Sequence, residues 1–202
     1  CWPNMSMIAY KHVKGIRWKN NIKPITDLIL KKENIDPKGF RKVSTEPTEI
    51  FAEGDWFLSN CKSTPIVSRP NKEKVDPLNR ASLIHRDIGT NLIEEPNGSV
   101  KLIDWQCPAQ GDICEDIFAF LSPGFHILAG RSPLSKKSNE DFWLYLKSPD
   151  IFARYRKLKS AYAWRHGSYC LWKSEITKEK QLKLKYKNAA EADFSYITKS
   201  FL

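Results

Sequence analysis

One Asn-Gly pair, at positions 97 and 98, constrains the fold more than any other feature of the sequence. It follows Pro96 and separates two short apolar runs, residues 91–93 and residues 100–103. Asn and Gly readily adopt the positive φ angles of tight hairpin turns, so the pattern predicts two antiparallel strands joined by this turn. A third short apolar run, residues 82–84, precedes them. We expect all three strands to form one small antiparallel unit.

The remainder of the chain is mainly helical in pattern. Residues 24–35 carry apolar side chains at helical spacing, and Pro47 suits the first turn of a helix over residues 45–61. Further helices are predicted over residues 112–122, 138–147, 149–166, a segment around 167–176, and 178–198. Residues 62–80, rich in Pro and charge, predict a long loop, and residues 7–10 a strand. The predicted fold class is α+β, a mainly helical domain with a small embedded β-hairpin.

Composition narrows the class of protein. With 202 residues and 41% hydrophobic composition the chain can bury a core, and we expect no membrane span because no run of 18 apolar residues occurs. Five scattered cysteines predict reduced thiols and a cytoplasmic location. The net charge of +10 permits a nucleic-acid-binding protein as one alternative, yet no reader motif is present and nucleic acid is not the expected partner.

Two carboxylates and an amide lie at the ends of the predicted strands. Asp87 follows the first strand, Asn91 begins the second, and Asp104 follows the third. In metal-assisted phosphoryl transfer, one carboxylate orients the proton of the attacking hydroxyl. A second carboxylate and an amide oxygen are hard ligands of the kind that Mg²⁺ prefers. The pattern therefore points to this chemistry, with turn residues of no chemical role as the alternative interpretation.

Three segments together resemble the aminoglycoside phosphotransferase family, which is related to choline kinases and more distantly to protein kinases. They are HRDIGTN at 85–91, LIDW at 102–105 and GDICEDIFAF at 111–120. The resemblance implies the C-lobe of a kinase-like fold, in which residues 1–18 end the N-lobe and form the hinge. Residues 19–202 would form the C-lobe, with a catalytic loop at 85–91, a metal segment at 103–105 and a helical substrate subdomain at 120–200. The implied cofactors are ATP and Mg²⁺, and the implied substrate is a small-molecule hydroxyl acceptor.

The resemblance also implies a role for each matching residue. Asp87 corresponds to the catalytic carboxylate, and Asn91 and Asp104 to the residues that hold the metal and the nucleotide. His85, Asp112 and Asp116 correspond to residues that support the loop, with Asp112 also expected to cap the following helix. We expect the acceptor pocket in the helices after residue 120, and as candidate lining residues we name Glu140, Asp141, Trp143 and Tyr145.

Two departures from the family pattern affect these expectations. Asp87 and Asn91 are four positions apart where the family has five. The missing residue could displace Asn91 by up to ~3.5 Å, the reach of one extended residue, with Thr90 or water as substitute ligands. No glycine-rich loop or strand lysine precedes the hinge.

The second departure leads us to expect either a fragment of a longer phosphotransferase or a degenerate product. In both cases the chain alone would be incomplete or inactive as a kinase. The surface that meets the N-lobe in the family would then be exposed, which predicts self-association. The alternative function is that of a pseudo-phosphotransferase acting as a binding or scaffolding protein.

Overall fold

A computed structural model describes residues 12–198 of the chain. The predicted α+β class and its mainly helical character are confirmed by seven helices and two small antiparallel sheets within that range. The helices are α1 (Lys23–Glu33), α2 (Pro47–Ser59), α3 (Ile113–Leu121), α4 (Pro123–Leu128), α5 (Lys136–Leu146), α6 (Pro149–Ile176) and α7 (Lys180–Thr198). The strands are β1 (Ile16–Arg17), β2 (Ser82–Ile84), β3 (Leu92–Glu94), β4 (Val100–Leu102) and β5 (Ala109–Gly111). The strand predicted at 7–10 lies outside the described residues.

The predicted hairpin is present. Strands β3 and β4 pair with Leu92 opposite Leu102, and Gly98 in the turn has a φ of 80°. Strand β1 pairs with the other edge of β3. Gly15 permits that approach, because a Cβ atom there would lie 2.4 Å from the carbonyl oxygen of Glu94. The hairpin thus belongs to a three-stranded sheet with a short outer strand.

The expectation that residues 82–84 join this sheet is wrong. Strand β2 pairs instead with β5, whose sequence Ala-Gln-Gly carries no strand signal, and the two strands form a separate sheet. Close packing explains the choice of partner, since a Cβ on Gly111 would lie 2.5 Å from the Cδ1 atom of Ile84. The loop 85–91 therefore connects two sheets rather than two strands of one unit.

The predicted helices over 24–35 and 45–61 and the long loop at 62–80 are confirmed. The two segments predicted at 149–166 and 167–176 form one continuous helix, α6. Gly167 does not interrupt it, because its missing side chain gives room to the ring of Phe194 on α7. The sequence interpretation also missed α4, a helix of six residues that Ser122 caps. None of the helices in the described part of the chain is long and apolar enough to cross a membrane.

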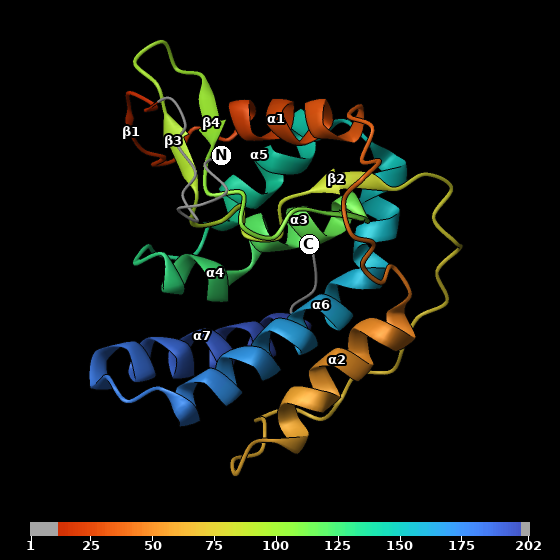
Figure 1. Cartoon of the computed structure of the whole chain (residues 1–202), viewed down its shortest axis with the longest axis vertical. Coiled ribbons are helices and arrows are strands. Elements are labelled where there is room, and N and C mark those ends of the chain that lie inside the picture. The colour runs from red at the N-terminus through yellow and green to blue at the C-terminus, as the bar shows by residue number, and fades with distance from the viewer. Residues whose placement is uncertain (1–11, 199–202) are drawn as a thin grey trace, which may run out of the picture.

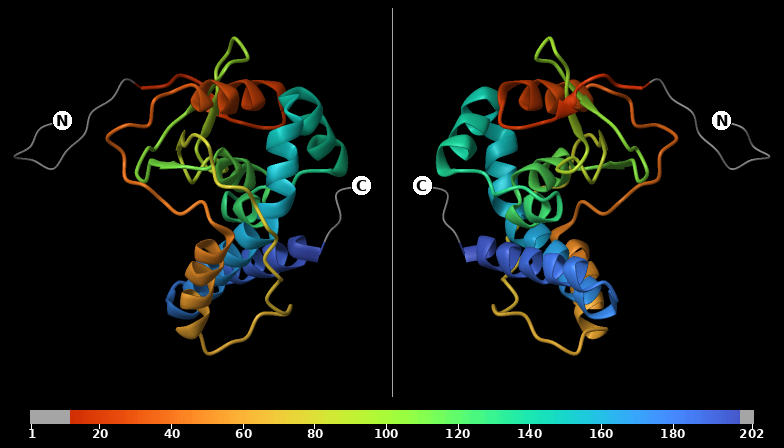
Figure 2. Two further views of the ribbon diagram at one scale, coloured as in Figure 1. Left: turned by 90° about the vertical axis from the view of Figure 1, so that its right-hand side faces the viewer. Right: turned by 90° about the vertical axis from the view of Figure 1, so that its left-hand side faces the viewer.

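The elements place the loop 85–91 at the centre of the molecule. In Figures 1 and 2 the hairpin and α1 lie on one side, and α2 and α7 lie on the opposite side. The short helix α3, which is buried along its whole length, lies between them. The long helix α6 begins beside α5 and runs toward α2 and α7. Helix α6 packs against α2, α3 and α7. This arrangement surrounds the loop with side chains from segments far apart in the sequence.

Candidate active site around Asp87

His85 attaches the loop to the segment after β4. Its side chain is buried, its Nε2 atom lies 2.9 Å from the carbonyl oxygen of Ile103, and its ring meets that of Trp105 edge to face at 4.7 Å. Its Nδ1 atom accepts a hydrogen bond from the backbone N–H of Asp87 at 3.3 Å. Burial lowers the pKa of His85, against the opposing effect of the Asp116 charge. These contacts describe a neutral imidazole with its proton on Nε2.

Asp116 holds the backbone at the start of the loop. Its carboxylate accepts hydrogen bonds from the N–H of His85 at 2.8 Å and from the N–H of Arg86 at 2.7 Å. It also forms a buried ion pair with Lys32 of α1. Arg86 has a φ of 73°, which side-chain-bearing residues seldom adopt. The carboxylate of Asp116 therefore compensates for a strained loop conformation that precedes Asp87.

Both carboxylate oxygens of Asp87 accept hydrogen bonds from the same loop. Thr90 Oγ1 donates to one oxygen at 2.8 Å, and Asn91 Nδ2 donates to the other at 3.1 Å. Burial raises the pKa of Asp87 above its ordinary value, and these hydrogen bonds act in the opposite direction. Asp87 is thus oriented by its neighbours and is a stronger base than an exposed aspartate.

The short loop still brings Asn91 to Asp87. The Asn91 N–H lies 3.4 Å from the Ile88 carbonyl oxygen, which closes a tight turn, and Asn91 Nδ2 donates to the Asp87 backbone oxygen at 2.9 Å. Gly89 makes this turn possible, since a Cβ there would lie 2.6 Å from the carbonyl oxygen of Ala119. With Nδ2 bound to Asp87, the Oδ1 atom of Asn91 is the one left for another partner.

Asp104 lies near Asn91 along the hairpin. The N–H of Ile103 donates to the backbone oxygen of Asn91 at 3.0 Å, so Asp104 follows directly after this pair of residues. Asp104 is exposed and has a φ of 60°, a conformation that aspartate tolerates better than most residues. Asn91 Oδ1 and the Asp104 carboxylate are hard oxygen donors, which fits Mg²⁺, an ion that keeps several water or phosphate ligands. No group of three His, Cys, Asp or Glu side chains suited to a metal occurs among residues 12–198.

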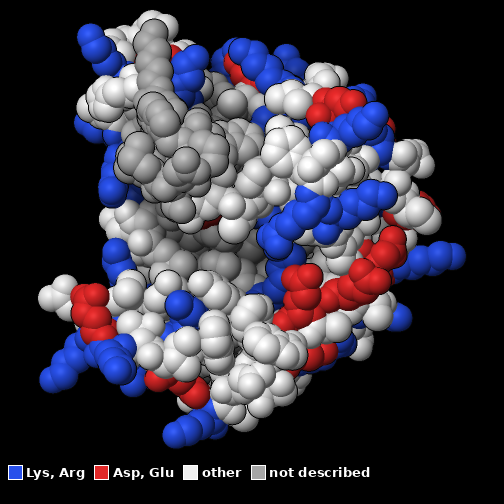
Figure 3. Space-filling model, in the orientation of Figure 1, with Lys and Arg blue, Asp and Glu red and all other residues white. Residues whose placement is uncertain are grey.

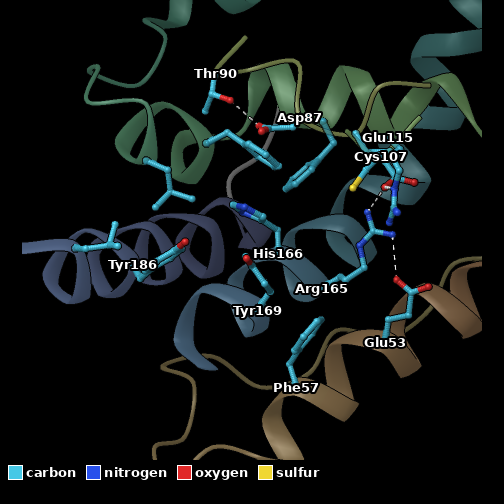
Figure 4. A pocket seen from close by; sticks show the side chains of 16 residues that line it. Glu53, Phe57, Asp87, Thr90, Cys107, Glu115, Arg165, His166, Tyr169 and Tyr186 are labelled. Atoms are coloured by element: carbon cyan, nitrogen blue, oxygen red, sulfur yellow. Dashed lines mark hydrogen bonds and ion pairs between the residues drawn. The ribbon is translucent and has the colours of Figure 1, made fainter. Parts of the chain in front are cut away.

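Asp87 opens into a cavity of about 560 Å³, here called the aromatic cavity. Figure 4 shows Asp87 and Thr90 on one side of it, with rings from α2, α6 and α7 facing them. Its ring-bearing lining residues are Phe57, Phe118, Phe125, His166, Tyr169 and Tyr186. Such a concave, mainly apolar site with a few convergent polar groups is typical of small-molecule binding.

The other charges of the aromatic cavity neutralise one another. Glu115 accepts from Arg86 Nε at 2.8 Å and from Arg165 at 2.7 Å, and Arg165 also pairs with Glu53 at 3.3 Å. Two of these contacts appear in Figure 4 as dashed lines around Arg165. Asp87 is therefore the carboxylate of the described lining that has no cationic ion-pair partner.

His166 is a residue of the aromatic cavity to which the sequence analysis assigned no role. Its ring stacks on that of Phe125, with centroids 3.9 Å apart, and its Nδ1 atom pairs with the buried carboxylate of Asp193 on α7. Asp193 is fixed in turn by Ser122 Oγ at 2.6 Å and by the Gly124 N–H at 2.9 Å. The partner lies 27 positions away on another helix, so no local sequence signal could have identified this pair.

The residues named in advance for the acceptor pocket do not line the aromatic cavity. Glu140 and Asp141 pair with lysines one turn earlier on α5, while Trp143 packs among aromatic side chains and Tyr145 faces solvent. Helix α5, which carries all four residues, packs against α1, on the other side of the molecule from α7.

Asp112 takes a structural position. It is the N-cap of α3, where its side chain accepts from the Cys114 N–H at 2.9 Å, and it pairs with Arg154 at 2.5 Å. The described cysteines, Cys61, Cys107, Cys114 and Cys170, are free thiols.

In comparisons with known proteins, the chain matched no family model, no curated protein and no solved structure.

Proposed function

We propose that the chain is a phosphotransferase of the aminoglycoside phosphotransferase type, which transfers the γ-phosphoryl group of ATP to a hydroxyl group of a small molecule. The observation that carries the proposal is the placement of Asp87, whose carboxylate is fixed by Thr90 and Asn91 at the edge of the aromatic cavity. The volume of about 560 Å³ lies within the range of pockets that bind small molecules.

In this proposal Asp87 orients and deprotonates the acceptor hydroxyl. The hydroxyl donates a hydrogen bond to an Asp87 carboxylate oxygen, and the proton moves to that oxygen as the hydroxyl oxygen attacks the γ-phosphorus of ATP. The bond from the γ-phosphorus to the bridging oxygen breaks, and ADP leaves. A raised pKa makes the Asp87 carboxylate a better proton acceptor. Thr90 and Asn91 keep the carboxylate in one orientation, which lowers the entropic cost of reaching the reactive geometry.

Asn91 Oδ1 and the Asp104 carboxylate are the groups that would hold Mg²⁺. When bound, Mg²⁺ neutralises charge on the phosphate groups of the donor. His85 supports this arrangement because its side chain joins the loop to Ile103, the residue that precedes Asp104. Asp116 supports it from the other side through the backbone of His85 and Arg86.

The lining of the aromatic cavity favours an acceptor with an apolar body. Its two arginines and two glutamates are paired with one another, so they do not offer a set of free carboxylates to a polycation. The rings of Phe57, Tyr169 and Tyr186 offer large apolar surfaces instead. An alcohol with an aromatic or aliphatic body and one hydroxyl near Asp87 fits this chemistry.

The test is transfer of phosphate from isotopically labelled ATP to a panel of alcohols in the presence of Mg²⁺, with products identified by mass spectrometry. We expect a phosphorylated product with the native protein and none with Asp87→Asn. Asp141→Asn is the matched control, since Asp141 belongs to a surface ion pair on α5 and should be dispensable. Absence of any product across the panel, or equal loss in both variants, would count against the proposal.

A binding protein without catalytic activity is the second candidate. It is favoured by the position of Asp104, which is exposed and does not line the aromatic cavity. Thermal melts with ATP, with and without Mg²⁺, separate the two candidates when combined with Asp104→Asn. A ligand at about 100 times its Kd stabilises the folded state by about 2.7 kcal/mol. Stabilisation that needs Mg²⁺ and Asp104 supports the phosphotransferase, whereas metal-independent stabilisation without any transfer supports the binding protein.

A further inference from the structure

A second cavity lies next to the loop and differs from the first in charge. It has a volume of about 830 Å³ and shares Thr90 and Leu128 with the aromatic cavity, so the two are neighbours. We call it the basic cleft because four cationic side chains line it and no Asp or Glu occurs among its described lining residues. The four are Arg17, Lys19, Arg131 and Lys185. Asn91 also lines this cleft.

These cations come from three separate parts of the chain. Arg17 ends β1 and Lys19 follows it, Arg131 lies in the connection after α4, and Lys185 lies on α7. On the face drawn in Figure 3, acidic side chains gather in a band at the right that basic side chains border. A cluster that the fold assembles from distant segments without a carboxylate therefore differs from the average surface of this basic protein.

Arg131 occupies the cleft without an acidic partner. Its guanidinium lies over the ring of Trp18 at 5.3 Å and donates to the carbonyl oxygen of Gly89 in the loop. Its Nε atom is buried and has no hydrogen-bond partner among the described residues. The other partly buried arginines near the centre, Arg86, Arg154 and Arg165, each pair with a carboxylate. Burial, and after it the nearby charge of Arg17, lower the pKa of Arg131.

Lys185 lies on the opposite wall, where it is exposed to solvent and likewise has no acidic partner among the described residues. Its ammonium donates to the backbone carbonyl of Leu128 at 3.3 Å and belongs to none of the ion pairs recorded between described residues. Backbone carbonyls satisfy hydrogen bonds but do not neutralise a positive charge. The cleft therefore has uncompensated positive charge on both sides, which an anion would offset.

We propose that the basic cleft binds a phosphate group of a small molecule, held by Lys19, Arg131 and Lys185 beside Asn91. Phosphate presents several acceptor oxygens and a double charge, and it matches the donors of guanidinium and ammonium groups. The inference rests on the proposed function only where it names the molecule that carries the phosphate. That phosphate group belongs either to the nucleotide donor or to an acceptor that is already phosphorylated.

The test measures anion binding directly by titration calorimetry at low salt, with inorganic triphosphate as the probe. We expect saturable binding at one site. Lys19→Gln combined with Lys185→Gln should weaken it about tenfold, because two charge-assisted contacts are lost. The matched control is Lys14→Gln combined with Lys183→Gln, which removes the same charge from exposed positions outside the cleft lining and should change the affinity less than about twofold. Equal weakening in both double variants, or no saturable binding, would overturn the inference.

Two further arms identify the source of the phosphate. Competition between triphosphate and ATP assigns the cleft to the donor, whereas binding of glucose 6-phosphate in preference to glucose, undisturbed by ATP, assigns it to a phosphorylated acceptor. Either result supports a phosphate site, and both depend on the Lys19 and Lys185 pair. Asp87→Asn distinguishes failure of this inference from failure of the proposed function, because that variant should lose phosphoryl transfer and still bind triphosphate. If triphosphate binds selectively but neither the native protein nor any variant transfers phosphate, the phosphate site is supported and the proposed enzymatic function is contradicted.

Discussion

Lys32 and Asp116 form an ion pair in the interior although 84 positions separate them in the sequence. Their side chains are 3% and 0% exposed, so the pair is removed from water. Asp116 also accepts the backbone N–H groups of His85 and Arg86. Helix α1 is thereby joined to the conformation of the loop that carries Asp87.

Replacing Lys32 by Met should therefore destabilise the protein. The substitution keeps an unbranched apolar chain but leaves the Asp116 charge buried without its cation, which typically costs about 3–5 kcal/mol. Urea unfolding measures the change in the free energy of unfolding. Lys23→Met on the same helix removes an exposed pair with Asp27 and should cost about 0.5 kcal/mol or less. The double variant Lys32→Met with Asp116→Asn should recover part of the loss, and a cost as small as that of Lys23→Met would contradict the assignment.

Asp87 should dominate the pH dependence of phosphoryl transfer. Because its pKa is raised by burial, kcat/KM should begin to fall with decreasing pH above the usual range of an aspartate. Asp87→Asn should reduce kcat by about two to four orders of magnitude, the range for a general base. A rate profile that stays flat down to the ordinary pKa of an aspartate would argue against this role.

The raised pKa of Asp87 also affects the stability of the fold. A folded-state pKa above the unfolded value means that the folded protein binds the proton more tightly, so the contribution of Asp87 to stability falls as the pH rises through that interval. Burial of the Asp87 carboxylate thus lowers stability once the pH exceeds that interval. Asp87→Asn should raise the melting temperature at neutral pH while it removes activity, and a clear decrease in melting temperature would contradict this account.

His126 should make the fold sensitive to moderate acid. Its ring is buried, its Nε2 atom lies 2.8 Å from the Phe120 carbonyl oxygen, and burial lowers its pKa to about 4. The unfolded chain then binds the proton more readily, so stability is complete above about pH 6.5 and is lost as the pH falls toward 4. Between about pH 7 and pH 5 the native protein should lose about 2 kcal/mol more than His126→Gln. The exposed His12→Gln serves as control in the same urea titrations and should follow the native protein.

Gly167 offers a test of the packing between α6 and α7. Alanine is the better helix former by about 1 kcal/mol, but a Cβ at this position would lie 2.8 Å from the ring of Phe194. Overpacking a well-filled interface typically costs about 1–3 kcal/mol, so Gly167→Ala should be destabilising overall. Thermal melts should show a lower melting temperature, which Phe194→Leu in the same chain should partly restore. Stabilisation by the single substitution would mean that the helices separate easily.

The sequence predicted those parts of the fold that local patterns determine. The Asn-Gly turn identified the hairpin, and apolar spacing with Pro47 identified α1 and α2. It failed at β5, where Ala-Gln-Gly becomes a strand only because β2 needs a partner. It failed again at Gly167, where a helix breaker in isolation is accommodated by a ring from another helix.

The candidate site also has a part that local sequence determines and a part that depends on tertiary packing. Asp87 and Asn91 belong to one short loop and could be grouped from their spacing, and the structure places them in contact. The walls of both cavities could not be predicted, because Phe57, His166 and Lys185 come from three helices whose packing is a tertiary property. The pairing of His166 with Asp193 carries no sequence signature for the same reason.

Helix α7 separates two environments with neighbouring residues. Lys185 faces the basic cleft, and Tyr186 faces the aromatic cavity. Successive helical residues point about 100° apart, so a rigid shift or rotation of α7 cannot alter one cavity and leave the other unchanged. A ligand that displaces α7 when it binds on one side would therefore change the affinity on the other side, and this effect would be reciprocal.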